Sequence, residues 1–133
     1  MLKNRRCFFV AALAAVVFSG LAQAQFDKTP WPSGQARPTI DWVDLDGRHW
    51  TAEQLKGRVV VLNFWASWCG PCKEEMPSLQ TLHETDPAQL VVIGINVKES
   101  ASTVRRFVKS QRLDFPEVLD PQGDLARQWD VRI

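Results

Sequence analysis

The sequence predicts an α/β fold in which a largely parallel sheet is flanked by helices. Two nearly continuous apolar runs, residues 59–65 and 90–97, have the β-branched composition of strands buried on both faces. A segment with helical periodicity separates them, so we expect a right-handed strand–helix–strand unit with parallel pairing. An Asp46-Gly47 pair between two shorter strand-like runs predicts a β-hairpin ahead of this unit.

Residues 1–24 have the pattern of a secretory signal peptide. Lys3, Arg5 and Arg6 precede an apolar run from Phe8 to Phe18, and Ala22-Gln23-Ala24 supplies the small residues of a cleavage site. The alternative is an uncleaved membrane anchor, but the apolar run is short of the roughly 20 residues that a span needs. We therefore expect a periplasmic or otherwise extracytoplasmic protein, associated with the membrane only if the signal is not cleaved.

The remaining chain is predicted to form one small domain. Residues 25–38 are rich in proline and indicate an extended linker, and the domain is expected to occupy residues 39–133. Without the three basic residues of the signal, the chain keeps 13 Lys and Arg against 15 Asp and Glu. Such a mixed, slightly acidic surface argues against nucleic-acid binding. Cys7 is expected to leave with the signal.

The hairpin should use residues 40–45 and 48–51, and residues 53–56 are expected to form one helical turn ended by Gly57. After the first long strand, Met76, Leu79 and Leu82 have the spacing of the buried side of a helix. Pro77 falls inside this helix, where it removes a backbone hydrogen bond and should produce a kink.

A second helix is expected after the second long strand. Its inward positions are Val104, Phe107, Val108 and Gln111, and Ser100 or Ser102 is placed to cap it. Residues 115–119 are then predicted to be extended, residues 120–123 to form a turn, and residues 124–129 to form a short helix.

Cys69 and Cys72 lie where the first long strand gives way to its helix. Pro71 suits a first helical turn, which places Cys69 at the helix N-terminus, where free N–H groups and the helix dipole favour a thiolate and should lower its pKa. Cys72, one turn further on, should be less exposed. Gly70 and Pro71 set the conformation of the short loop between them. We predict that Cys69 attacks a substrate disulfide and that Cys72 resolves the mixed disulfide.

Other uses of the cysteine pair remain open on these residues. A structural disulfide would close a loop too short to restrain the unfolded chain. A metal site needs about four ligands, and His49 and His83 are the only other soft candidates. A structural bridge would also leave unexplained the position at a helix start and the flanking Trp65 and Trp68, which are expected to shield one side from water. The CxxC pair directly after a strand of a strand–helix–strand unit favours redox catalysis.

The segment 63–72, NFWASWCGPC, resembles the active-site stretch of thioredoxin-like proteins. The following residues 73–77, KEEMP, resemble the TlpA/ResA branch of extracytoplasmic thiol-disulfide oxidoreductases, as do the hairpin, the LKG turn at 55–57, and the FP and DP pairs at 115–116 and 120–121. The resemblance covers residues 39–133 and is specific for the fold, but much less so for the substrate.

This resemblance implies an enzyme that exchanges thiols and disulfides with protein substrates. Members of the branch are typically reductants that are recharged by a membrane thiol-disulfide relay, and many act in cytochrome c maturation. Cys69 matches the nucleophile, Cys72 the resolving cysteine, and Glu75 a carboxylate thought to tune thiol protonation. No cofactor is implied beyond the redox-active pair. An oxidant, an isomerase or a non-catalytic binding domain are the alternatives.

The chain departs from the family pattern in two places. Asn63 stands where thioredoxin has a buried Asp, so a base for Cys72 would have to be Glu75 or water. The family pattern also continues after Ile133 with a cis-proline loop, two strands and a helix. We therefore expect a thioredoxin-like sheet that lacks these C-terminal elements, an exposed edge along residues 59–65, and marginal stability.

Overall fold

The computed structural model describes residues 28–133, so the predicted signal and Cys7 lie outside the described residues. Residues 28–40 contain no helix or strand, and residues 32–133 form one compact unit. Within the described part of the chain, every helix is too short or too polar to cross a membrane.

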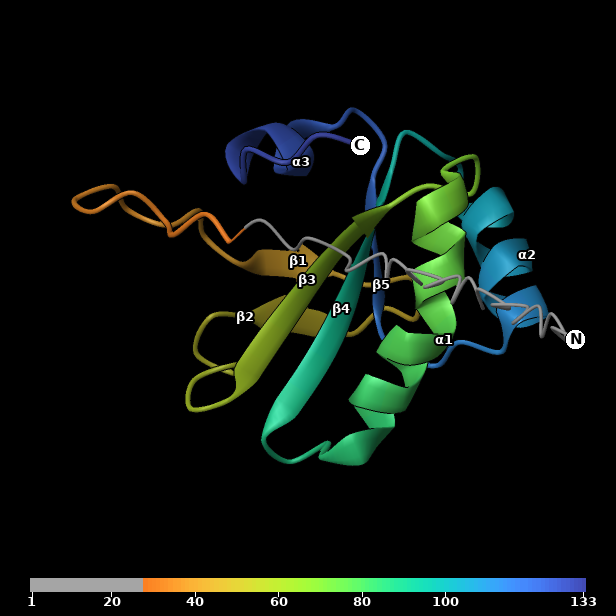
Figure 1. Ribbon diagram of the computed structural model, residues 1–133, viewed down its shortest axis with the longest axis horizontal. Coiled ribbons are helices and arrows are strands. Elements are labelled where there is room, and N and C mark those ends of the chain that lie inside the picture. The colour runs from red at the N-terminus through yellow and green to blue at the C-terminus, as the bar shows by residue number, and fades with distance from the viewer. Residues whose placement is uncertain (1–27) are drawn as a thin grey trace, which may run out of the picture. The chain divides into compact units, whose positions relative to one another are not determined.

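The unit is built on a three-stranded parallel sheet with helices α1 and α2 on one face (Figure 1). The strands are β3 (Val59–Trp65), β4 (Leu90–Val97) and β5 (Glu117–Asp120), in the order β3-β4-β5. Helices α1 (Gly70–Thr85) and α2 (Ala101–Gln111) connect them in turn. The parallel pairing predicted for the two long strands is confirmed.

β4 is the central strand and β3 lies at an edge of the sheet as described. The prediction of a strand buried on both faces holds for β4, whose residues from Val91 to Val97 are all buried. It is wrong for β3, where Val59 is 60% exposed and only Trp65 is fully buried. The reason is that β4 has a strand on each side, whereas β3 is paired only with β4 among residues 28–133. The exposed edge expected along residues 59–65 is therefore present.

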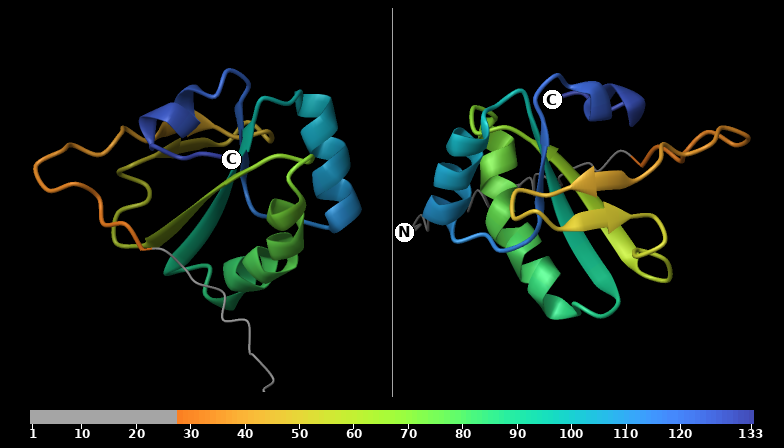
Figure 2. Two further views of the ribbon diagram at one scale, coloured as in Figure 1. Left: turned by 45° about the horizontal axis from the view of Figure 1, so that its top comes forward. Right: turned by 180° about the vertical axis from the view of Figure 1, so that it is seen from behind.

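Two apolar cores lie on the opposite faces of β4. Figure 2 shows the hairpin on one side of the sheet and the helices α1 and α2 on the other. Because successive side chains of a strand point to opposite faces, β4 contributes to both cores in alternation. The hairpin-side core contains Trp42, Trp50, Leu55, Val91, Ile93, Ile95 and Val118, and the helix-side core contains Trp65, Met76, Val92, Val104, Leu113 and Phe115.

The predicted hairpin is formed by β1 (Asp41–Val43) and β2 (His49–Thr51), which pair antiparallel. Asp44 holds its turn: its carboxylate accepts hydrogen bonds from the backbone N–H groups of Asp46 and Arg48 and from the Trp50 indole at 2.8 Å. The backbone N–H of Leu45 donates to the carbonyl of Glu117 at 2.8 Å, which ties the hairpin to β5.

Helix α1 differs from its prediction in one inward position. Met76 is fully buried and Leu79 half-buried as expected, but Leu82 is 36% exposed. His83 faces the sheet instead, and its Nδ1 accepts a hydrogen bond from the backbone N–H of Val92 at 3.3 Å. Positions 76, 79 and 83 follow the 3.6-residue period more closely than 76, 79 and 82. The helix runs through Pro77 as one element.

The remaining elements match the prediction closely. Ser100 caps α2 by accepting a hydrogen bond from the Thr103 N–H at 3.3 Å, which decides between the two proposed caps. Gln111 is exposed rather than inward-facing. Residues 52–57 form turns rather than a helix, and α3 (Asp124–Gln128) is the expected short helix.

Candidate active site

The two cysteines form a disulfide at the N-terminus of α1. Cys69 is the N-cap residue, and its Sγ accepts a hydrogen bond from the backbone N–H of Cys72 at 3.3 Å. Gly70 begins the helix and Pro71 lies in its first turn, as predicted. Both cysteines are half-buried, and Cys72 packs against the helix-side core. The Cys69 sulfur therefore lies where α1 presents its free N–H groups and the positive end of its dipole.

The loop that delivers Cys69 is held by Glu99, a residue that the sequence analysis did not single out. Its carboxylate accepts a hydrogen bond from the Ser67 backbone N–H at 2.7 Å and another from the Ser67 hydroxyl at 2.5 Å. It accepts a third from the Asn96 side chain at 2.8 Å. Glu99 thus ties the residues just before Cys69 to the end of β4.

Glu99 is suited to this role only as a carboxylate, because its three partners are all donors. Partial burial by itself raises the pKa of Glu99. The hydrogen bonds from Asn96 and Ser67 outweigh that effect and lower the pKa below its ordinary value of 4.5. The loop is therefore fastened by an ionised group at neutral pH.

The two tryptophans before Cys69 have opposite environments, which corrects the prediction that both flank the site. Trp65 is completely buried, and its ring lies 4.7 Å from that of Phe107 between centroids. Trp68 is 62% exposed. It borders a cavity of about 170 Å³ that is lined also by Val97, Lys98 and Arg127. Only Trp68 is therefore placed to contact a partner molecule.

Glu117 is a second carboxyl group that the sequence analysis missed. It is the first residue of β5 and only 4% exposed. The Trp65 indole N–H donates to its Oε2 at 2.8 Å. Its carboxyl group lies directly against Gly94 of β4, where a Cβ atom would come within 2.2 Å of Oε2, so only glycine fits there. The available signal was an acidic residue between Pro116 and Val118 in an otherwise apolar run.

Burial changes the protonation of Glu117. Removal from water raises its pKa to about 8, although the hydrogen bond from Trp65 acts in the opposite direction. Glu117 is consequently protonated for the most part at neutral pH. Because Oε2 accepts from Trp65, the proton belongs on Oε1.

Glu75 and Asn63, the two residues considered near the thiols, differ in their exposure to solvent. Glu75 is exposed on α1, and it makes no hydrogen bond or ion pair within residues 28–133. Asn63 is half-buried in β3, and its side-chain amide donates to the Met76 sulfur at 3.9 Å. Asn63 is therefore packed into the domain, whereas Glu75 is open to solvent.

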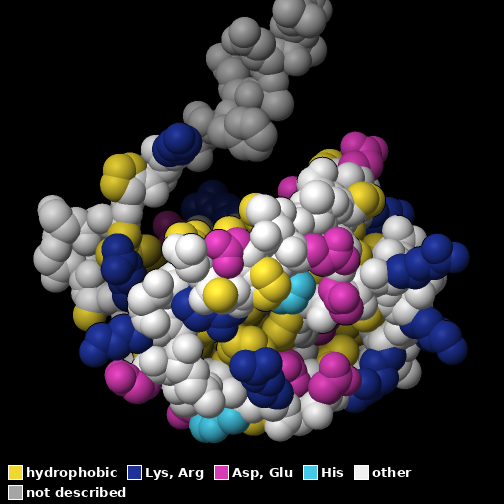
Figure 3. Space-filling view, turned by 90° about the horizontal axis from the view of Figure 1, so that it is seen from below, with side chains coloured by type: hydrophobic (Ala, Val, Ile, Leu, Met, Phe, Trp, Pro, Cys, Tyr) yellow, Lys and Arg dark blue, Asp and Glu magenta, His cyan; other side chains and the backbone are white. Residues whose placement is uncertain are grey.

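The two histidines considered as metal ligands are occupied elsewhere. His49 pairs with Asp41 across the hairpin at 2.5 Å, and His83 accepts from β4. In the described range 28–133, no three His, Cys, Asp or Glu side chains gather in a way that would hold a metal ion. On the face seen in Figure 3, Lys and Arg side chains alternate with Asp and Glu, as the near balance of charges in the sequence indicates.

Comparison with known proteins places this site in a family. Residues 33–133 match the AhpC/TSA family. The thiol-disulfide oxidoreductase ResA of Bacillus subtilis is 32% identical over 98% of this chain and 76% of its own length. The sporulation thiol-disulfide oxidoreductase A of the same organism is 33% identical over 86% of this chain and 68% of its own length.

A solved structure agrees with these relatives. A putative thiol:disulfide interchange protein DsbE from Chlorobium tepidum is 27% identical, with a TM-score of 0.65 over 71% of this chain and 67% of its own. The fold, the helix-capping cysteine pair and these relatives lead to the same assignment. The chain belongs to the AhpC/TSA family and is a thioredoxin-like thiol-disulfide oxidoreductase of the type of ResA, DsbE and StoA of Bacillus subtilis, a further solved structure that this chain resembles.

Proposed function

We propose that this enzyme is an extracytoplasmic reductant of protein disulfides, with Cys69 as the nucleophile and Cys72 as the resolving cysteine. The observation that carries the proposal is the position of Cys69 as the N-cap of α1, where its sulfur accepts the Cys72 N–H. A helix N-terminus stabilises negative charge, and a thiolate is the reactive form of cysteine. The signal-like segment 1–24 supports the location outside the cytoplasm.

The proposed reaction has two exchange steps. In the reduced enzyme, the Cys69 thiolate attacks one sulfur of a substrate disulfide. A bond forms between that sulfur and Cys69, the substrate bond breaks, and the departing substrate sulfur takes up a proton. Cys72 then loses its proton and attacks Cys69, which forms the intramolecular disulfide and releases the second substrate thiolate. Two electrons pass to the substrate, and the disulfide seen here is the oxidised product state.

The substrate and the electron donor form the finer part of the proposal. Reduction of apocytochrome cysteines before haem attachment is the substrate class we favour, with a membrane thiol-disulfide relay as the donor that restores the dithiol. The Gly-Pro pair between the cysteines, shared with thioredoxin, supports a reducing direction. Exposed Trp68 and its neighbouring cavity offer a place for a substrate segment beside the cysteines.

Trapping and potential measurements test this proposal. Cys72→Ser should accumulate a mixed disulfide with a cysteine-containing apocytochrome peptide, whereas Cys69→Ser should accumulate none. Equilibration with glutathione should give a reduction potential in the region of thioredoxin, about −270 mV. A potential near that of DsbA, about −120 mV, would indicate an oxidant instead. Trapping through Cys72 alone would contradict the assigned roles.

A further inference from the structure

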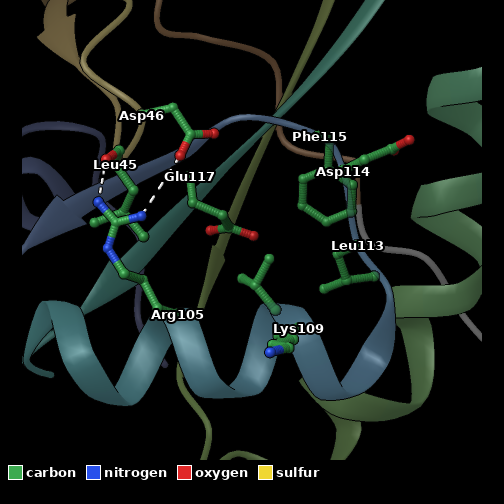
Figure 4. A pocket seen from close by; sticks show the side chains of 9 residues that line it. Leu45, Asp46, Arg105, Lys109, Leu113, Asp114, Phe115 and Glu117 are labelled. Carbon is green, nitrogen blue, oxygen red and sulfur yellow. Dashed lines mark hydrogen bonds and ion pairs between the residues drawn. The ribbon is translucent and has the colours of Figure 1, made fainter.

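The buried residue Glu117 lines a cavity whose lining does not include the cysteines. The cavity has a volume of about 200 Å³ and lies between the hairpin turn, α2 and the start of β5. Figure 4 shows the Glu117 carboxyl group in the middle of the side chains that line it. Among residues 28–133, no group hydrogen-bonds Glu117 Oε1, although the atom is shielded from solvent. A buried polar atom without a partner calls for an explanation, and a bound molecule is one.

The polarity of the cavity favours an occupant that accepts hydrogen bonds. Oε2 of Glu117 accepts from the Trp65 indole, so the proton lies on Oε1, the oxygen without a partner, and Glu117 is part of the cavity lining. That protonation follows from burial, which raises the pKa of Glu117 to about 8. The charged groups around Glu117 are Arg105 and Lys109 on α2, Asp46 in the hairpin turn, and Asp114 before β5.

Two charged groups at the rim, Lys109 and Asp114, have no partner of opposite charge among residues 28–133. Arg105 is joined to Asp46 by an ion pair at 3.5 Å and to the Leu45 carbonyl by a hydrogen bond, as Figure 4 shows. Asp114 accepts from the side chain of Gln80. Lys109 has no acidic partner among the described residues. An anionic occupant would therefore meet a donor at the base and, at the rim, the Lys109 cation beside the Asp114 carboxylate, which already accepts from Gln80.

We propose that this cavity binds a small monocarboxylate with an apolar body, whose carboxylate accepts the Glu117 O–H. An O–H···O⁻ hydrogen bond is about twice as strong as one between neutral groups. Leu45, Val108, Leu113 and Phe115 provide apolar walls for the rest of the molecule. A cavity of about 150 Å³ is large enough for benzene. A molecule of the size of benzoate thus suits both the volume and the polarity.

Benzoate is therefore the probe, and benzylammonium is its cationic counterpart of similar size. The full chain is labelled with ¹⁵N, and the Trp65 indole signal, identified by its loss in Trp65→Phe, reports on Glu117 directly. Benzoate should shift this signal saturably at pH 6.5. Its affinity should fall about tenfold by pH 9, because about nine tenths of Glu117 is then ionised. Benzylammonium should give no saturable shift.

Three variants complete the test. Glu117→Gln keeps a donor without a titrating group, so benzoate binding should persist and lose its dependence on pH. Lys109→Gln changes an exposed residue of α2. It should lower the affinity for benzoate by about twofold to fivefold, as expected for the loss of a partly screened charge. Arg106→Gln, its exposed control on the same helix, should change nothing.

Each contrary result would overturn the proposal. Lack of saturation with benzoate would mean that the cavity holds water only. Tighter binding of benzylammonium would mean that Glu117 serves as an anion rather than a donor. Equal effects of Lys109→Gln and Arg106→Gln on benzoate affinity would show that Lys109 does not contribute to binding. If benzoate binding to Glu117→Gln still weakened with rising pH, Glu117 would not be the donor.

Discussion

The Trp65 indole donates to the Glu117 carboxyl group across 52 positions of sequence, at 2.8 Å and with both side chains buried. This bond joins the end of β3, four residues before Cys69, to the start of β5. The bond also reduces the cost of burying Glu117, because a buried polar group that has no hydrogen-bond partner destabilises the fold more than one that has a partner.

Glu117 should make the stability of the protein fall as pH rises from about 5 to 8. In the unfolded chain Glu117 ionises near 4.5, whereas in the folded protein it holds its proton up to about 8. Across that window the folded state binds more protons, so its stability declines with pH and levels off above 8. The rise in pKa corresponds to at most about 5 kcal/mol in the free energy of unfolding.

Glu117→Gln removes this titration while keeping the shape of the side chain. The free energy of unfolding of the variant, relative to that of the unmodified protein, should therefore increase by several kcal/mol from pH 5 to pH 8. Urea denaturation of both proteins at matched pH measures the difference. A constant difference over the window would show that Glu117 is ionised in the folded state.

Glu99→Gln should loosen the segment that carries Cys69. The substitution removes the charge that accepts from Ser67 and Asn96, and we expect a loss of about 1 to 2 kcal/mol at pH 7, reduced by the partial exposure of the group. The lowered pKa of Glu99 means that its contribution is present above about 4.5 and is lost as pH falls through the folded value. The loss caused by Glu99→Gln should accordingly shrink in acid.

Hydrogen exchange at the Ser67 amide gives a local measure of the same effect. That amide donates to Glu99 at 2.7 Å and should exchange faster in Glu99→Gln. Glu84→Gln is the control, since Glu84 is exposed on α1 and accepts only from Gln80. Equal exchange rates in the two variants would show that Glu99 does not hold the loop.

Glu75→Gln should slow the resolution of the mixed disulfide more than the first attack. Asn63 cannot take a proton from Cys72, so the exposed carboxylate of Glu75, three residues further along α1, is the proposed base. Stopped-flow kinetics separates the two steps. Glu74→Gln, an equally exposed neighbour, controls for the change in charge, and equal effects of the two variants on both steps would contradict the assignment.

Trp68→Ala should weaken protein substrates without altering the redox couple. Trp68 is 62% exposed beside the cysteines, and truncating an aromatic anchor at an interface typically changes affinity by about tenfold or more. We expect kcat/KM for a disulfide-containing protein to fall by about that factor, whereas the reduction potential and the rate with a small disulfide stay the same. A changed potential would place the role of Trp68 in the chemistry instead.

The sequence was sufficient for the parts of the structure that depend on local pattern. The apolar composition of residues 90–97 predicted the central strand, and Pro71 beside the cysteines predicted where α1 begins. The error at Leu82 arose because a helical period of 3.6 residues permits two neighbouring choices about two turns after Met76, and His83 was considered only as a possible metal ligand.

Glu99 and Glu117 were missed for a different reason. Each acts through contacts with residues far away in the sequence, Glu99 with Ser67 and Glu117 with Trp65. An isolated acidic residue in a sequence is most often a solvated one, and only the fold brings these two against their donors. The exposure of the β3 side chains was likewise missed, because it depends on the order of strands in the sheet rather than on the residues of β3.

Stabilisation of a Cys69 thiolate by the N-terminus of α1 affects the direction of electron transfer. This stabilisation acts only on the reduced enzyme, because the disulfide form carries no thiolate. It therefore shifts the redox equilibrium towards the dithiol. A larger thiolate fraction at Cys69 is therefore accompanied by weaker reducing strength. A change at the start of α1 that stabilised the thiolate less would make the enzyme a stronger reductant and Cys69 less reactive at neutral pH.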